Sequence, residues 1–264
     1  SITSGINSLN YYYLVSSEAK FYDTKSPYID LSLFFGGNGR SMVDFVFSRN
    51  INKNWNIGFD IHRISADKQI SASKAKGDKN INSSLFKLFV YHKSEDEKLT
   101  LYSDFVSFRH QILGNGGVDV DSDSLPLNFF TYNDFSTRLK DIENLERRKR
   151  LNLFLNYKII EGLEIYNDFY FKTQQVEYMD ENYVENAPYY NDFFLSNIST
   201  LDSVKIKSVV NRAGVRGLLG DIKYNFYANY KNLNYLYTDN LNANIFNEIY
   251  LGGIINFSRK EFDI

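Results

Sequence analysis

Apolar and polar residues alternate along most of this chain, from Tyr28 to Phe257. An apolar residue recurs at about every second position, which is the period of a half-buried β-strand and not the period of a helix. Residues 55–62 show the pattern most clearly, because Trp, Ile, Phe and Ile alternate there with Asn, Gly, Asp and His. The sequence therefore predicts an all-β protein with almost no helix.

The alternating runs predict eleven strands, and the connections between them differ in length. The predicted strands span roughly 10–20, 27–35, 41–49, 55–64, 83–93, 99–112, 146–159, 163–176, 203–218, 222–235 and 247–258. Short turns are predicted at 23–26, 50–54, 94–98, 160–162 and 219–221, and longer loops at 65–82, 113–145, 177–202 and 236–246. The short connection 36–40 is the exception, because it stands where this alternation calls for a long loop.

This alternation of short and long connections favours a membrane barrel over a soluble β-sandwich, whose loops have no systematically long and short ends. Outer-membrane barrels combine short periplasmic turns and long extracellular loops with strands that are apolar outward and polar inward. We therefore expect a single antiparallel, up-and-down transmembrane β-barrel domain over residues 1–264. Eleven is an odd number, whereas single-chain bacterial barrels close with an even one, so further strands are expected beyond one or both ends.

Composition and charge exclude several other classes of protein. The chain contains no Cys, which rules out disulfides and thiolate chemistry. Its 30 basic and 32 acidic residues give a net charge of −2, so nothing draws the whole chain toward nucleic acid. The longest unbroken apolar run, residues 11–15, is far shorter than the roughly 18 residues of a membrane-spanning helix. The first residues also lack the basic start and apolar core of a signal peptide.

Three short motifs carry a family resemblance. Residues 22–28 read Tyr-Asp-Thr-Lys-Ser-Pro-Tyr and precede a strand and Gly36-Gly37, residues 50–58 read Asn-Ile-Asn-Lys-Asn-Trp-Asn-Ile-Gly, and residues 115–117 read Asn-Gly-Gly. In these motifs the chain resembles the putative porins of Bacteroidetes outer membranes, by motif over residues 20–120 and by pattern elsewhere. The resemblance implies a barrel in the bacterial outer membrane without catalytic residues. Members of that family are longer, which implies that this chain is a fragment.

The alternation also assigns side chains to the two surfaces of a barrel wall, because apolar positions face lipid and their neighbours face the lumen. The predicted lipid-facing residues are Ile29, Leu31, Leu33, Trp55, Ile57, Phe59, Ile61, Leu151, Leu153, Leu155, Ile222, Tyr224 and Phe226. The predicted pore-lining residues are Asp30, Asp44, Asp60, Asp104, Arg148, Arg150, Lys158, Asp168, Lys172, Arg212 and Arg216. Imperfect alternation leaves open which face of strands 83–93 and 99–112 points outward.

The predicted pore-lining charges divide by sign along the chain, with acids early and bases late. Opposed acidic and basic walls would set an ion preference by their field. Alternatively, these charges pair across neighbouring strands and contribute little beyond solvation.

From these observations we expect a porin-like channel for passive diffusion of small hydrophilic solutes, with loop 113–145 constricting its mouth. The alternatives are a non-conducting barrel with a structural or assembly role and an outer-membrane hydrolase, although no Gly-x-Ser-x-Gly motif appears. The basic run at residues 146–150 is expected at the extracellular rim, in contact with lipopolysaccharide and not with nucleic acid.

No cofactor or metal ion is expected. Residues 119–123 resemble the start of a calcium loop, but the glycine at its sixth position and the glutamate at its twelfth are missing. The three histidines fall on separate predicted strands or strand ends. The transported solute and the oligomeric state do not follow from the sequence.

Overall fold

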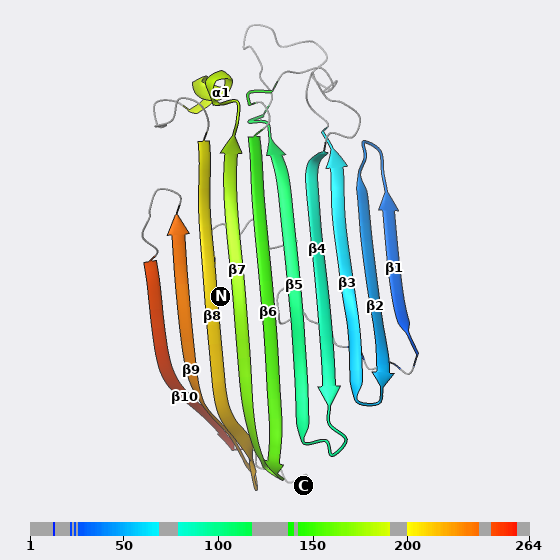
Figure 1. Ribbon diagram of the computed structural model, residues 1–264, viewed down its shortest axis with the longest axis vertical. Helices are drawn as coiled ribbons and strands as arrows, with labels where there is room; N and C mark the ends of the chain where they lie inside the picture. The colour runs from blue at the N-terminus through cyan, green and yellow to red at the C-terminus, as the bar shows by residue number, and fades with distance from the viewer. Residues whose placement is uncertain are drawn as a thin grey trace, which may run out of the picture.

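The strands of this protein form one antiparallel sheet of ten strands in chain order. The computed structural model describes residues 13, 22, 24, 26–68, 79–117, 137–139, 142–190, 200–237 and 244–257. The strands are β1 (Tyr28–Phe35), β2 (Ser41–Asn52), β3 (Trp55–Asp67), β4 (Lys79–Lys93), β5 (Leu99–Gly114), β6 (Ile142–Ile160), β7 (Leu163–Asp180), β8 (Thr200–Leu219), β9 (Ile222–Tyr237) and β10 (Asn244–Phe257). Figure 1 shows them side by side in a single curved layer. Within the described residues β1 and β10 do not pair, so the sheet is not closed.

Ten of the eleven predicted strands are present, and several extend further than predicted. The strand predicted at 10–20 lies outside the described residues, except for Tyr13, which is not in a strand. β4 begins at Lys79, β8 begins at Thr200 and β7 ends at Asp180. The added residues are mostly polar, so they lack the apolar alternation by which a strand is predicted. They nevertheless pair with the neighbouring strand, as Asp180 does with Thr200.

The connections sort by length onto the two ends of the sheet, as predicted. At the end that carries the helix α1 (Tyr183–Tyr190), which we call the loop end, connections span residues 68–78, 115–141, 181–199 and 238–243 (Figure 1). At the opposite end, which we call the turn end, they span only 53–54, 94–98, 161–162 and 220–221. The connection 36–40 at the loop end is again the short exception.

The residues of the turns explain why the connections at the turn end are short. In the turn between β2 and β3, the Asn52 side-chain oxygen accepts hydrogen bonds from the backbone N–H groups of Asn54 and Trp55, at 2.8 and 3.0 Å. Such local bonding by asparagine side chains favours turns over continued strand. In the turn between β6 and β7, Gly162 adopts a φ of +80°, which a residue with a Cβ rarely adopts.

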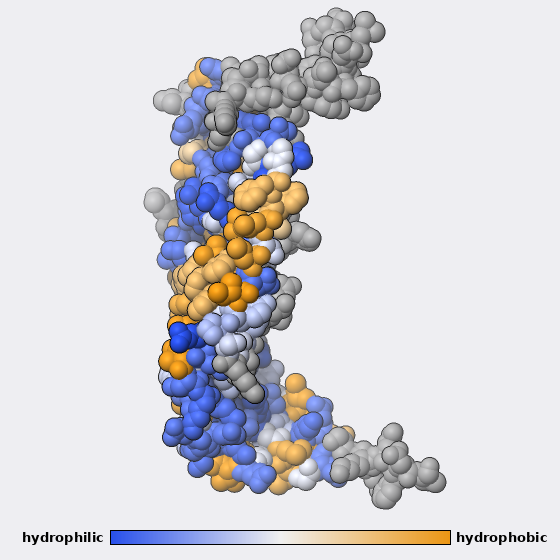
Figure 2. Space-filling view, turned by 90° about the vertical axis from the view of Figure 1, so that its right-hand side faces the viewer, coloured by the Kyte–Doolittle hydropathy of each residue, from blue (hydrophilic) through white to orange (hydrophobic). Residues whose placement is uncertain are grey.

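The strand register gives the sheet two chemically different faces. The apolar face, as we define it, carries Ile29, Phe47, Phe59 and Leu151 together with the other side chains of the same alternation. The polar face carries the side chains in between, among which are most of the charged residues near mid-strand. Figure 2, which looks onto the β1 edge, shows apolar residues gathered at mid-height between hydrophilic regions.

The register also settles the orientation of β4 and β5, which the sequence leaves open. Leu85 and Phe89 of β4 lie on the polar face and are buried, whereas Phe86 and Leu88 lie on the apolar face and are exposed. A small hydrophobic cluster on the polar face joins Leu85 to Val106, Phe108 and Tyr13. The core is therefore a local patch on one face of a single layer, whereas most large apolar side chains of the other face remain exposed.

Candidate pore-lining and lipid-facing surfaces

All eleven residues predicted to line a pore have the alternation of the polar face. The pairing of Asp44 with His62, of Asp60 with Lys87 and of Arg150 with Lys172 places their side chains on the same side of the sheet. The register continues the same face to Asp168 and Arg212, which stand directly opposite each other. Whether these residues line an aqueous lumen stays a prediction.

On β1 to β4, the acidic side chains of the polar face have neighbouring partners. Asp44 contacts the Nδ1 atom of His62, and the Asp60 carboxylate accepts a hydrogen bond from Lys87 Nζ at 3.1 Å. Asp30 has the weaker contact, a 3.4 Å hydrogen bond from the Tyr28 hydroxyl. Two of the three early acids therefore face a base or a histidine on the adjacent strand.

The centre of the polar face, on β5 to β7, holds a buried ionic cluster. The Arg150 guanidinium donates two hydrogen bonds to Asp104 Oδ2, at 2.7 and 3.2 Å. Arg148 Nε donates to Glu146 Oε1 at 2.5 Å, and Gln174 donates to the same oxygen at 2.7 Å. All five side chains are at least 98% buried. Charges buried this deeply require such pairing, because desolvation disfavours the isolated ion.

Tyr13 covers this cluster. Its ring lies 4.7 Å from the Arg148 guanidinium carbon and 5.5 Å, edge on, from the Phe108 ring. A second residue ahead of β1, Tyr22, contacts Phe89 on the same face, with ring centroids 6.0 Å apart. The predicted strand 10–20 includes Tyr13, whereas the structure places this residue outside any strand, on the polar face over β5 and β6.

On β6 to β9, bases outnumber acids on the polar face. Arg216 donates to Glu164 Oε2 at 3.0 Å and to Asn156 Oδ1 at 3.1 Å. Arg212 lies 4.7 Å from the ring of Tyr227. Within the described residues, neither Arg212 nor Lys158 nor Lys172 has a carboxylate at ion-pair distance.

These contacts pair several of the charges with neighbouring groups, whereas an ion preference set by the two walls stays a prediction. Ion pairing neutralises part of each wall through three residues that sequence reasoning did not select. Lys87 and Glu164 pair across neighbouring strands, whereas Glu146 pairs with Arg148 on its own strand. The sequence could have indicated these residues, because each has the alternation of the polar face. Identifying the two cross-strand pairs, however, requires the register of the strands. Among the predicted pore-lining residues that the structure describes, the charges outside these ion pairs are Asp30 on β1 and, on β6 to β8, three bases with one acid: Lys158, Lys172, Arg212 and Asp168.

All thirteen residues predicted to face lipid lie on the apolar face, and many are exposed, among them Leu31 at 54% and Phe226 at 50%. Toward the turn end, the Trp55 ring stacks on His92 with centroids 4.1 Å apart. Tyr230 lies at the middle of β9. Contact of this face with lipid stays a prediction.

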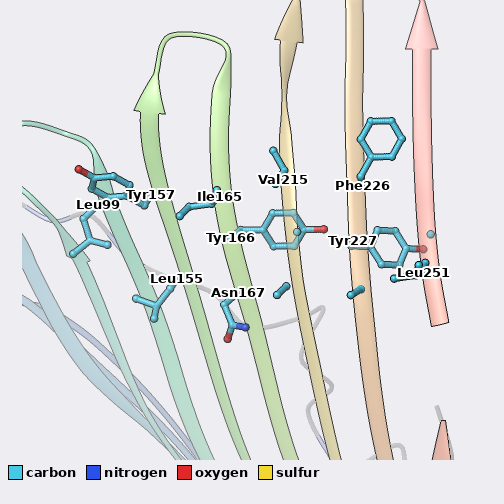
Figure 3. A pocket seen from close by; sticks show the side chains of 14 residues that line it. Leu99, Leu155, Tyr157, Ile165, Tyr166, Asn167, Val215, Phe226, Tyr227 and Leu251 are labelled. Carbon is cyan, nitrogen blue, oxygen red and sulfur yellow. The ribbon is translucent and has the colours of Figure 1, made fainter. Parts of the chain in front are cut away.

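The apolar face also contains a groove of about 900 Å³. Figure 3 shows side chains from β5 to β10 around it. The small residues Ala213 and Ala228 are among those that line it. Leu155, Ile165 and Val215 are among its walls, and it lies away from the charged residues of the polar face. This groove is a mostly apolar hollow in the sheet surface.

Metal binding finds no support in the described part of the chain. No group of three His, Asp or Glu side chains with the arrangement of a metal site occurs among the described residues. The segment 119–123 and most of loop 113–145 lie outside the described residues. Among the described residues, no helix is long and apolar enough to span a membrane.

A meandering antiparallel sheet with an exposed apolar face and an ion-paired polar face defines the wall of an up-and-down β-barrel. The family described as "Putative porin" matches residues 3–264, and the chain belongs to this family. Among solved structures, the chain is similar to BauA, the ferric preacinetobactin receptor from Acinetobacter baumannii, with a TM-score of 0.52 and 13% identity. That likeness covers 89% of this chain and 39% of the receptor, so the chain spans about two fifths of the receptor's length. No curated protein matches the chain significantly.

Proposed function

We propose that this chain forms part of an outer-membrane channel that admits small hydrophilic solutes by passive diffusion. The observation that carries the proposal is the division of one continuous sheet into an exposed apolar face and an ion-paired polar face. Exposed side chains such as Leu251 at 82% and Ile249 at 76% would be costly in water, whereas lipid accommodates them. A polar face enclosed by a complete barrel would provide an aqueous path.

The proposed location is the bacterial outer membrane, with the loop end outside the cell. Long loops on the extracellular side and short turns on the periplasmic side are typical of such barrels. The proposed partners are outer-membrane lipids, including lipopolysaccharide, at the apolar face and small solutes at the polar face. The proposed role is transport without catalysis, a cofactor or a metal ion.

Conductance tests this proposal directly. The protein is purified in detergent and added to a planar lipid bilayer at two KCl concentrations, and liposome swelling with sugars is measured in parallel. We expect stepwise current increases that scale with salt, together with swelling. A correctly folded barrel that inserts but gives neither current nor swelling would contradict the channel.

A second candidate, a non-conducting barrel, is favoured by the contacts of Tyr13. This side chain is 94% buried on the polar face, where it covers Arg148 and Phe108. If such contacts block the lumen, the wild-type protein conducts little and Tyr13→Ala conducts more. An open wild-type channel with the same conductance as Tyr13→Ala would remove this candidate.

A further inference from the structure

The apolar face changes character abruptly toward the loop end, where six basic residues cross the sheet. They are Arg63, Arg109, Arg147, Lys149, Lys205 and Lys207, and we call them the basic band. The register places Arg109 directly opposite Arg147. On β4, Ser84 stands opposite both Arg63 and Arg109. On β7, Gln175 stands opposite both Arg147 and Lys205, so these residues form one row across the sheet.

A second row, one alternation nearer the turn end, completes the band. Thr173 of β7 stands between Lys149 of β6 and Lys207 of β8. The basic band therefore runs from β3 to β8 on a single face of the sheet.

The charges of the basic band are poorly neutralised by the protein itself. Neither row contains an acidic residue on this face. Glu177, one row nearer the loop end, accepts a hydrogen bond from Arg147 at 2.6 Å. Across the described part of the chain, Lys149, Lys205 and Lys207 have no carboxylate within ion-pair distance. Like charges placed directly opposite each other destabilise a sheet. Glu177 offsets the charge of Arg147, whereas Arg109 has no carboxylate at ion-pair distance among the described residues, so a further anion would stabilise this pair.

The apolar rows begin immediately below the basic band. The next row toward the turn end consists of Phe105, Leu151 and Phe171, which stand side by side in the register. Two residues along a strand correspond to about 6.6 Å, so the change from basic to apolar happens within one step of the alternation. In a bilayer, the change from hydrocarbon to headgroup is where lipid phosphates lie, and guanidinium and ammonium groups bind phosphate through charge-assisted hydrogen bonds.

We propose that the basic band binds the phosphate groups of lipids in the membrane leaflet at the loop end. This inference rests on the proposed function, because it takes the apolar face to be the lipid-facing surface. The contiguous apolar rows commit the site to lipid-borne phosphate, since a soluble anion would gain nothing from them. Five of the six basic residues are exposed, so a headgroup can reach them.

Native mass spectrometry in detergent tests the proposal with two probes that differ only in their phosphates, diphosphorylated lipid A and the same lipid without phosphates. We expect the wild-type protein to retain the phosphorylated probe preferentially. The triple variant Arg109→Gln/Lys149→Gln/Lys207→Gln should bind it at least about tenfold more weakly, because each cation near a membrane surface adds to the attraction.

The matched control is Lys53→Gln/Lys98→Gln/Lys223→Gln, which removes the same charge from exposed positions at the turn end. It should bind lipid A as the wild type does. If the triple variant misfolds, the single variants Lys149→Gln and Lys207→Gln provide the same test at exposed positions.

Three results would overturn the proposal: equal binding of both probes by the wild type, an equal loss in the control, or displacement of lipid A by inorganic phosphate. The test is independent of channel activity, because lipid retention is read in detergent. A barrel that binds lipid A but passes no current would overturn the proposed function alone.

Discussion

Glycine on the polar face allows aromatic rings to lie flat against the backbone of a neighbouring strand. A Cβ at Gly58 would lie 2.2 Å from Cζ of Phe89 and 2.5 Å from the Phe47 carbonyl oxygen. The same arrangement recurs at Gly214, where a Cβ would lie 2.7 Å from the Tyr166 ring. These close approaches explain the glycines at these two positions, because a Cβ there would clash with the ring of the neighbouring strand.

We expect Gly58→Ala to destabilise the protein by about 1–3 kcal/mol, because the new methyl group must displace the Phe89 ring or the strand. Urea unfolding of the refolded barrel, followed by the fluorescence of Trp55, measures the change in the free energy of unfolding. Gly37→Ala is the control, since a Cβ there meets no atom within 4 Å. Equal stability of the two variants would contradict the steric argument.

The buried pair of Asp104 and Arg150 gives a second prediction. Removing one partner of a buried ion pair leaves the other charge without compensation, so Asp104→Ala should cost about 3–5 kcal/mol. Asp30→Ala serves as the comparison, because within the described residues its carboxylate has only the long hydrogen bond from Tyr28. The same urea titration decides the matter, and a loss no greater than that of Asp30→Ala would show that the pair is not held as described.

The contrast between these two aspartates marks the limit of sequence reasoning for single residues. Alternation alone assigned Asp30, Asp104 and Arg150 to one face, because the period of a strand is fixed. It could not distinguish an exposed acid from a buried one, because Asp104 and Arg150 are 46 residues apart in sequence. Their contact depends on the register between β5 and β6 and on cover from Tyr13.

Among the elements, α1 is the one that the alternation did not predict. Its eight residues carry no clear amphipathic pattern, and side chains at the end of β7 hold it, chief among them the Asp180 carboxylate. Asp180 accepts hydrogen bonds from the Asn182 backbone at 2.8 Å, the Asn186 side chain at 3.0 Å and the Tyr190 hydroxyl at 2.7 Å. The strands were predictable because their period is local, whereas this helix depends on contacts with Tyr178 and Asp180 of β7.

Asp180→Ala should therefore release α1 while leaving the sheet intact, because several donors lose their shared acceptor at once. Limited proteolysis of the folded barrel should cut within residues 181–190 faster than in the wild type. The control is Asp202→Ala, which removes an exposed acid from the start of the next strand. Unchanged cleavage in Asp180→Ala would mean that α1 is held by other contacts.

Tyr190 adds a pH dependence to the same element. Burial, followed by its hydrogen bonds with Tyr178 and Asp180, raises the pKa of Tyr190 above its ordinary value of 10.0. A raised pKa means that the folded protein favours the neutral phenol, so the stabilisation is present below pH 10 and is lost as the pH rises further.

The absorbance of phenolate at 295 nm, taken as wild type minus Tyr190→Phe, should therefore show this residue ionising above pH 10. In Asp180→Asn the raising effect of the carboxylate is absent, so the midpoint should fall. Ionisation at or below pH 10 in the wild type would contradict the hydrogen-bonded arrangement.

In the whole molecule, the strands lie in chain order, so the separation of acids and bases along the sequence becomes a separation across the sheet. Because every strand pairs with its sequence neighbours, acids from β1 to β3 and bases from β6 to β8 stay on separate sides of the polar face. This general arrangement could be predicted from the sequence, since a meander preserves chain order. The residual charge could not, because Lys87, Glu146 and Glu164 neutralise part of each side.

If the polar face lines a conducting lumen, its acids should favour cations and its bases should favour anions, so neutralising either group should shift the ion preference in opposite directions. Neutralising three bases with Lys158→Gln/Arg212→Gln/Arg216→Gln should shift the reversal potential in a KCl gradient toward cation preference. Replacing Asp30 and Asp44 by asparagine should shift the reversal potential toward anion preference. Comparing the base variant with the acid variant controls for general loosening of the barrel, because loosening would not shift the two in opposite directions. The shifts should shrink at high salt, because the Debye length falls from about 10 Å at 0.1 M to about 3 Å at 1 M. Shifts of the same sign in both variants would place the ions on a path that does not follow the polar face.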